Sequence, residues 1–512
     1  MLVNLIIPCL ILCLTLSGCA VNPVTGKNEI ALMSEAAEIS TGNKQYLPSR
    51  QMQGGDYNVN PEVVQYVQQV GNRLAAVSDR QLPYEFNVIN DSTPNAWALP
   101  GGKIAINRGL LTELNSEAEL AAVLSHEIIH AAARHGAKGM ERGILLQGVV
   151  LAAGMASQNS EYSGLAVGGA GVAAQLITTK YSRAAELESD FYGMKYMAKA
   201  GYDPQAAIEL QQTFVRLSEG RESGWINGLF ASHPPSLERV EANRKTAASL
   251  PAGGEIGRDR YLAALSPLRN DQDAYQAFDA GRKALNDGDT ALSLALAKKA
   301  LRLQPREALF HSLRGDIRFK QQHYHDAIIN YNRALQHNNN YFHYYLQRGL
   351  ANLELNQTTQ ANSDLKKSLD LLPTAPALNA LGQMALVQGD RSGAKSYFSA
   401  AAGSNSTAGK EANRALIQLD LPDNPHNYIH VKLLRDRYDT LQLQIINTTT
   451  LTIENTLIVI QFTDQNGKTR RVQQQLSRQL AGQSNTTITT GIGPLNTLKN
   501  LRAQVTNTKI VK

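Results

Sequence analysis

The run His-Glu-Ile-Ile-His at residues 126–130 constrains the fold and chemistry of this chain more than any other feature. It lies in a stretch, residues 118–130, whose composition and apolar spacing favour one helix. Helical winding places His126 and His130 on one face, one turn apart, as two ligands of a single zinc ion require. The carboxylate of Glu127 lies beside that face, where it can take a proton from a zinc-bound water. The pattern therefore predicts a helix that carries two metal ligands and a general base.

The residues around this run are typical of a helix with a buried side. Asn115 or Ser116 can cap its start, and Glu119 is placed for a capping box behind Ser116. Apolar residues at helical spacing supply the side to bury; they are Leu120, Val123, Leu124 and Ile128. The alternative is a pair of surface histidines on an ordinary helix, since a short motif alone is only a hypothesis. This context favours the metal site.

A mononuclear catalytic zinc needs a third protein ligand and one open position. His135 follows His130 by five residues, whereas the metzincin pattern needs a Gly between and a spacing of six. Glu186 and Asp190 lie four residues apart in a segment of helical pattern, so they share one face. From the residues alone, such acids are more typical of a solvated surface than of a metal site.

Four blocks of sequence, in order, resemble a known family over residues 20 to 250. They are residues 95–104, the H-E-x-x-H run, the E-x-x-x-D of Glu186 and Asp190, and His233-Pro234-Pro235 followed by Arg239. The family is that of the family 48 metallopeptidases, which includes the CAAX prenyl proteases, the bacterial heat-shock membrane protease and periplasmic zinc proteases with tetratricopeptide (TPR) repeats. The resemblance is closest to this last group, the β-barrel assembly-enhancing type, and it implies a gluzincin with one zinc ion per chain.

The resemblance implies that Glu186 is the third zinc ligand, beside His126 and His130. It also implies that Asp190 braces the site from behind a ligand, because ligating imidazoles usually donate their other N–H to a carboxylate or carbonyl. Ser189 stands where the family more often has Ala. This departure is conservative in size.

His233 is expected near the cleft, where the family's fourth block lies. Its imidazole could then hydrogen-bond the oxyanion of the reacting carbonyl, or occupy the open zinc position in a resting form. The alternative is a histidine at a helix start, with Pro234 and Pro235 setting the turn. The sequence leaves open whether His233 catalyses or regulates.

The block from Asn95 to Ile104 reads as an apolar strand broken by a turn signal, Pro-Gly-Gly at residues 100–102. We expect an edge strand beside the cleft that pairs with an extended substrate backbone. Its residues are Asn95, Ala96, Trp97 and Ala98. A hairpin buried for packing is the alternative.

Residues 1–18 are almost wholly apolar and end in Leu16-Ser17-Gly18-Cys19, which resembles a lipoprotein signal peptide with Cys19 as the lipidated residue. The segment lacks the usual positive charge at its start. Ala20 in place of Asp suggests sorting to the outer membrane. The expected location is therefore the periplasm, with a lipid anchor in the inner face of that membrane. Since the other two cysteines lie in the leader, the mature chain could form no disulfide.

Beyond residue 250 the pattern becomes repetitive. Glycines at 281, 315, 349 and 382 are spaced 34, 34 and 33 residues apart. A large apolar residue follows each by four positions, and a small residue by nineteen. This period resembles TPR helix pairs, whose stacked arrays offer concave binding surfaces, so we expect a docked protein partner. Outer-membrane assembly machinery is the expected partner.

From residue 428 onward, period-two alternation and an Asn466-Gly467 turn signal predict a small antiparallel β module. It carries 11 Lys and Arg against 4 Asp and Glu, a net +7, as large as the whole chain's +6. Attraction to an anionic membrane surface would be one use of that charge, and a soluble basic surface is the more ordinary interpretation. Nothing resembles a nucleic-acid-binding motif.

The sequence thus predicts a multidomain chain in three parts. These are a mainly α, zincin-type metalloprotease domain with a small β edge-strand element, an α-solenoid of TPR repeats, and a C-terminal antiparallel β module. The expected boundaries are a signal peptide 1–18, a protease domain 19–250, a linker 251–272, repeats 273–405, a linker 406–427 and a β module 428–512.

The expected function is that of a zinc-dependent endopeptidase of the bacterial cell envelope. Its expected substrates are misfolded or misassembled outer-membrane and periplasmic proteins. The rival is a TPR-based assembly factor or chaperone in which proteolysis is latent. The complete set of ligands and base favours the enzyme.

Overall fold

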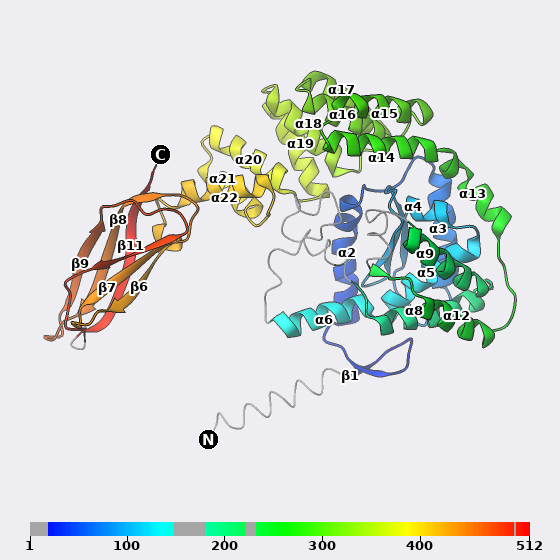
Figure 1. Cartoon of the computed structure of the whole chain (residues 1–512), viewed down its shortest axis with the longest axis horizontal. Helices are drawn as coiled ribbons and strands as arrows, with labels where there is room; N and C mark the ends of the chain where they lie inside the picture. The colour runs from blue at the N-terminus through cyan, green and yellow to red at the C-terminus, as the bar shows by residue number, and fades with distance from the viewer. Residues whose placement is uncertain (1–18, 148–175, 177–179, 221–231, 496–497, 512) are drawn as a thin grey trace. The chain divides into compact units, whose positions relative to one another are not determined.

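The computed structural model describes residues 19–147, 176, 180–220, 232–495 and 498–511. The expected signal peptide, 1–18, lies outside the described residues. The chain divides into two compact units, Met1–Ala377 and Leu378–Lys512, and each is described by itself (Figure 1). Within the described ranges, no helix is both long and apolar enough to cross a membrane.

A three-stranded sheet lies within the first unit, in the order β3-β5-β4. Its strands are β3 (Glu85–Ile89), β4 (Ala96–Leu99) and β5 (Lys103–Asn107). Strand β3 runs parallel to β5, and β4 runs antiparallel to it and forms one edge of the sheet. Pro100, Gly101 and Gly102 make the turn between β4 and β5, as the sequence predicted. Both glycines have positive φ, +78° and +83°, which explains their residue type.

Helices pack against this sheet and against one another (Figure 1). They are α2 (Glu35–Met52), α3 (Pro61–Ala75), α4 (Arg108–Glu113), α5 (Glu117–Ala132), α6 (His135–Gln147), α8 (Arg183–Lys199), α9 (Gln205–Gly220), α12 (Leu237–Ala248) and α13 (Arg258–Asn270). Every residue of α5 is buried, so it is the central helix of this part of the fold. A short antiparallel hairpin, β1 (Cys19–Val21) with β2 (Asn28–Ile30), precedes α2. The Asn22 side chain ties it to the backbone oxygen of Ala133, just beyond α5.

The repeats form antiparallel helix pairs with the predicted period. They are α14 (Gln272–Asn286) with α15 (Thr290–Leu303), α16 (Ala308–Lys320) with α17 (Tyr324–His337), and α18 (Phe342–Glu354) with α19 (Thr358–Leu371). The repeated glycines lie where the helices of a pair are closest. A Cβ on Gly315 would stand 2.5 Å from the ring of Tyr331, which is fully buried. A side chain there would separate the helices, which explains the register found in the sequence.

The first repeats contact the part of the same unit that holds the three-stranded sheet, through a buried polar cluster. The Glu307 carboxylate is fully buried and accepts hydrogen bonds from the Asn90 amide at 3.1 Å and the Tyr275 hydroxyl at 2.5 Å. The Arg108 guanidinium lies 3.4 Å from the centre of the Tyr275 ring and donates to Asn90. Asn90 follows β3 and precedes the edge strand β4. The repeats are therefore anchored beside the sheet.

The two segments expected to be linkers both contain helices. Between 251 and 272, α13 buries Tyr261 and Leu265, and the Tyr261 hydroxyl donates to Leu111 O at 2.6 Å. Between 406 and 427, α22 (Thr407–Asp420) contributes Ile417 to the core of the second unit. The sequence contains little sign of these two helices, because each buries only one narrow face and therefore has few, widely spaced apolar residues.

The second unit holds α21 (Arg391–Ala401), α22 and two three-stranded antiparallel sheets, while α20 (Ala375–Val387) begins in the first. The sheets run β10-β7-β6 and β11-β8-β9. Their strands are β6 (Ile429–Arg435), β7 (Leu441–Asn447), β8 (Ile453–Thr463), β9 (Thr469–Leu476), β10 (Ser484–Thr489) and β11 (Lys499–Ile510), after the short helix η1 (Pro425–Asn427). Alternate residues of β7 and β8 form a shared apolar core. Gly467, with φ +74°, makes the turn between β8 and β9. The predicted antiparallel β module is confirmed.

Candidate metal centre

Helix α5 carries the H-E-x-x-H run as the sequence predicted. Ser116 is the N-cap, and its hydroxyl accepts from the Glu119 N–H at 3.2 Å. The Glu119 carboxylate accepts in turn from the Asn115 N–H at 2.6 Å. This local arrangement fixes the start of the helix and so the direction in which His126 and His130 point. The structure therefore selects Ser116 over Asn115 as the cap.

Helix α8 lies against α5 and brings Glu186 and Asp190 to the same place. The two helices come close because position 193 is a glycine. A Cβ there would stand 3.2 Å from Ser125 Oγ and 3.3 Å from the His126 backbone nitrogen. Such distances leave almost no room for a side chain, so Gly193 sets how near the two carboxylates lie to the histidines.

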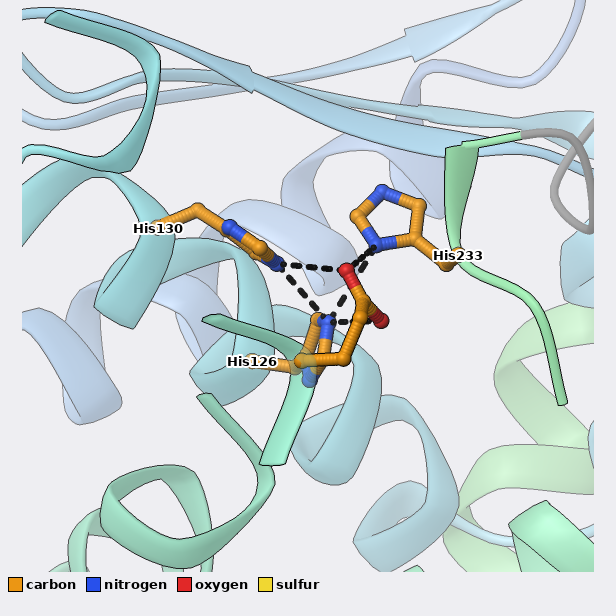
Figure 2. A group of neighbouring side chains, drawn as sticks. His126, His130 and His233 are labelled. Atoms are coloured by element: carbon orange, nitrogen blue, oxygen red, sulfur yellow. Dashed lines mark hydrogen bonds and ion pairs between the residues drawn. The ribbon is translucent and has the colours of Figure 1, made fainter. Parts of the chain in front are cut away.

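Four buried side chains converge on one point: His126, His130, Glu186 and His233 (Figure 2). One donor atom of each lies within 4.8 Å of every other. His126 Nε2 is 3.0 Å from His130 Nε2 and 3.3 Å from His233 Nδ1. The Glu186 carboxylate lies 3.4 Å from His130 Nε2 and 3.1 Å from His233 Nδ1. Two of the three expected ligands come from α5 and one from α8, and His233 joins them.

The chemistry of this donor set fits a metal ion. Imidazole nitrogens and a carboxylate oxygen are the usual ligands of a tetrahedral divalent cation. His126 has its other ring nitrogen engaged, because its Nδ1 lies 2.9 Å from Asp190 Oδ1. Its Nε2 therefore points a lone pair at the cluster when the ring is neutral. Asp190 thus lies against the ring nitrogen of His126 that faces away from the cluster.

Arg239 lies between the two carboxylates of α8. Its Nε and Nη2 each donate to Asp190 at 2.7 Å, and its Nη1 lies 2.9 Å from Glu186 Oε2. Burial raises the pKa of Asp190, but the charge and hydrogen bonds of Arg239, together with those of His126, outweigh burial and hold that pKa below its usual value. Burial also raises the pKa of Glu186, and the neighbouring histidines outweigh it in the same way. The surroundings of both carboxylates therefore favour the ionised form. The sequence singled out Arg239 but gave it no role.

In the metal-free protein these carboxylates also act on His126. Burial lowers its pKa, but the hydrogen bond to Asp190 and the nearby Glu186 outweigh burial and raise it to about 9. Burial lowers the pKa of His130 well below its usual value. A metal ion that binds here must therefore displace a proton from His126 around neutral pH.

Glu127 lies beside the cluster, as the helix predicted. Burial raises its pKa, and its Oε2 makes no hydrogen bond within the described part of the chain. Its Oε1 is 3.5 Å from His233 Nε2. A carboxylate with an unused buried oxygen next to the donor atoms can accept a proton from a reacting water.

His130 has different neighbours behind it. Its Nδ1 lies 3.0 Å from His135 Nδ1, and His135 Nε2 lies 3.1 Å from Glu188 Oε1. The ring of Tyr181 stacks on His130 with the ring centres 3.8 Å apart. The sequence reasoning missed Glu188 and Tyr181. Glu188 lies two residues after Glu186, and residues at that spacing face different sides of a helix. Its position in the sequence therefore did not indicate that it belongs to the site.

The predicted substrate strand, β4, is an edge strand whose side chains are all buried. Asn95 O accepts from the Asn107 N–H, so Trp97 pairs with β5 and the backbone groups of Ala96 and Ala98 face away from it. Ala98 O lies 3.5 Å from the Tyr181 hydroxyl. The outer edge of β4 is therefore next to the side chain that stacks on His130.

A small cavity of about 40 Å³ lies beside His126 and Glu127. Its lining includes the apolar side chains of Val123, Met194, Met197, Leu210 and Phe214. It also includes polar side chains of the cluster, among them His126, Glu127 and His233. Such a mixture is typical of a site that holds an apolar group next to reactive polar atoms.

An H-E-x-x-H helix joined by a carboxylate from a second helix defines one class of metallopeptidase fold. The family model described as peptidase family M48 matches residues 61–247. Metalloprotease YcaL of Escherichia coli (strain K12) is 30% identical over 191 residues, which cover 35% of this chain and 70% of that protein. The chain belongs to peptidase family M48.

Other similarities are narrower. The beta-barrel assembly-enhancing protease of Yersinia pestis is 33% identical over 211 residues, which cover 40% of this chain and 43% of that protein. This chain thus spans less than half the length of that relative. Among solved structures, a thermophilic TPR protein of Thermus thermophilus has 21% identity and a TM-score of 0.26 over 29% of this chain and 81% of that chain.

Proposed function

We propose that this protein is a zinc-dependent endopeptidase. The observation that carries the proposal is the convergence of His126, His130 and Glu186 at a buried point, with the unused oxygen of Glu127 beside it. A zinc ion held by these three residues supplies Lewis acidity toward the scissile carbonyl and toward water. Glu127 accepts the proton of the attacking water and returns it to the leaving amine.

Two surfaces beside the donor atoms suit a peptide. The outward backbone of β4 offers hydrogen bonds to an extended chain, which would make cleavage tolerant of sequence. The apolar pocket lined by Met194, Leu210 and Phe214 takes a side chain next to the scissile bond. His233 occupies the fourth corner of the cluster, so a substrate carbonyl must displace it or hydrogen-bond to it.

The test uses purified protein, zinc analysis and casein digestion with and without a chelator. We expect Glu127→Gln to keep one zinc per chain and to lose digestion, because only the proton acceptor is removed. His126→Ala should lose both. The control is Glu241→Gln on the exposed face of α12, which should retain zinc and activity. Digestion by clean Glu127→Gln protein would show that Glu127 is not the base.

We further propose that the protein works in the bacterial envelope as a quality-control protease. Similarity to proteins named beta-barrel assembly-enhancing protease supports an envelope role. The apolar leader and Cys19 support a lipid anchor, and the repeats support a docked protein partner, for which outer-membrane assembly machinery is our candidate. Membrane fractionation of wild type and Cys19→Ala tests the anchor. Release of wild type with the soluble fraction would contradict it.

The rival proposal, an assembly factor with latent proteolysis, is favoured by one observation. His233 Nδ1 lies among the ligand atoms, where it would fill the position that a substrate needs. A strain without the gene, rescued with Glu127→Gln protein, separates the two proposals. Full rescue would favour the assembly factor, and failed rescue with normal protein levels would favour the protease.

A further inference from the structure

The chain turns sharply between His130 and His135. Helix α5 ends at Ala132, and Arg134 adopts the left-handed conformation with φ +65°, which L residues rarely adopt. The buried Arg134 side chain is held there by Glu38 Oε1 at 2.5 Å and by Met33 O at 2.7 Å. Backbone strain of this kind persists only where surrounding contacts enforce it, and it gathers at functional sites.

The strained turn brings His135 behind His130. Five residues along a continuous helix would place the two rings on different faces. Instead, His135 begins α6 with its Nδ1 3.0 Å from His130 Nδ1, and only 8% of the residue is exposed. Its other ring nitrogen, Nε2, lies 3.1 Å from Glu188 Oε1 on α8. The three side chains form a line that ends in a carboxylate.

The positions of the ring protons on His135 and His130 can be assigned by starting from Glu188. An ionised carboxylate only accepts hydrogen bonds, so His135 must carry its proton on Nε2 and donate it to Glu188. A neutral His135 then has a lone pair on Nδ1, which accepts from the Nδ1–H of His130. His130 is left with a lone pair on Nε2, the nitrogen that faces the other donor atoms.

Ser189 adds to this arrangement. It is fully buried, and its hydroxyl lies 3.4 Å from His135 Nδ1. A small polar side chain at this position therefore touches the ring that stands behind the ligand. His126 receives the same support directly from Asp190, whereas His130 receives it from Glu188 through an intervening imidazole.

We propose that His135 and Glu188 are positioning residues that fix the tautomer and ring orientation of His130 toward the metal. This inference rests on the proposed zinc site. His135 does not ligate the metal, since its Nδ1 faces His130 and its Nε2 faces Glu188. Partners of this kind behind a ligand usually change metal affinity by about 10- to 100-fold.

The test measures zinc affinity by competition with a chromophoric chelator. His135→Phe keeps the ring volume and removes the acceptor, and Glu188→Leu removes the terminal carboxylate. Each should weaken zinc binding by about 10- to 100-fold. His135→Asn should restore most of the affinity, because its amide oxygen takes the place of Nδ1. Glu241→Leu, an exposed change on α12, should bind zinc as wild type does.

Thermal unfolding of the metal-free variants separates positioning from folding. A purely structural role would lower the melting temperature without changing the zinc affinity of the folded protein, and that result would overturn the proposal. Affinities within twofold of wild type for both His135→Phe and Glu188→Leu would also overturn it. If His135→Phe does not fold, Glu188→Leu decides, because Glu188 is 22% exposed at its side chain. Wild-type protein that binds no zinc would instead overturn the metal site itself.

Discussion

Replacing Arg239 by Met should destabilise the metal-free catalytic part of the chain by about 3–5 kcal/mol, because breaking a buried ion pair strands an uncompensated charge. Arg239 and Asp190 are each 6% exposed at their side chains. Two N–H groups of Arg239 donate to Asp190 at 2.7 Å, and a third lies 2.9 Å from Glu186. At about 1.5–3 kcal/mol for each charge-assisted hydrogen bond, the pair to Asp190 alone accounts for this range.

The assay is urea unfolding of the metal-free protein, followed by tryptophan fluorescence. Both tryptophans of the chain, Trp97 and Trp225, precede residue 250, so the signal reports on the catalytic part. The control is Arg183→Met on α8, which breaks an Arg–Glu pair of the same kind with Glu238. Both side chains of that pair are solvent-exposed, so its loss should leave the unfolding free energy unchanged within error. If Arg239→Met lowers the free energy of unfolding by no more than this control does, the reasoning is refuted.

Two further predictions concern the metal and the repeats. Because the pKa of His126 rises to about 9 in the metal-free protein, zinc must displace its proton below that pH, so zinc affinity should rise by up to about tenfold per pH unit from 6.5 to 9. Chelator competition at several pH values measures this, and a flat affinity would contradict it. Glu307→Ala leaves the Asn90 amide and the Tyr275 hydroxyl without their buried acceptor, which should cost about 1–3 kcal/mol for each group. Thermal unfolding and limited proteolysis should show earlier release of the repeats, and an unchanged digestion pattern would argue against that anchoring role.

The features that the sequence predicted well are those that depend on residues close together in the chain. Ser116 and the apolar spacing identify α5, and its winding alone places His126 beside His130. The glycine period identifies the repeats because each glycine lies at a close approach between two helices, as Gly315 does against Tyr331. Alternation predicts the strands of the β module because one face of each sheet is buried.

The features that the sequence could not predict depend on distant parts of the chain. Nothing near Glu188 indicates that His135, 53 residues earlier, would lie against it. The same holds for Glu307, whose buried partner Asn90 is 217 residues away. The segment of α13 was expected to be a linker. Its helix is stabilised by contacts such as that of Tyr261 with Leu111, which lies far back along the chain and leaves no local signal.

Position 193 has a consequence for any attempt to redesign this centre. Since the glycine lets α8 lie close to Ser125 Oγ and to the His126 backbone nitrogen, a methyl group there would require these neighbours to move by a few tenths of an ångström. Where the backbone of α5 or α8 is what moves, the Glu186 carboxylate shifts relative to both imidazoles, although no donor residue has been altered. The distance between the Glu186 carboxylate and the two imidazoles thus depends on the absence of a side chain at position 193. A comparison of the donor residues alone would not reveal this dependence.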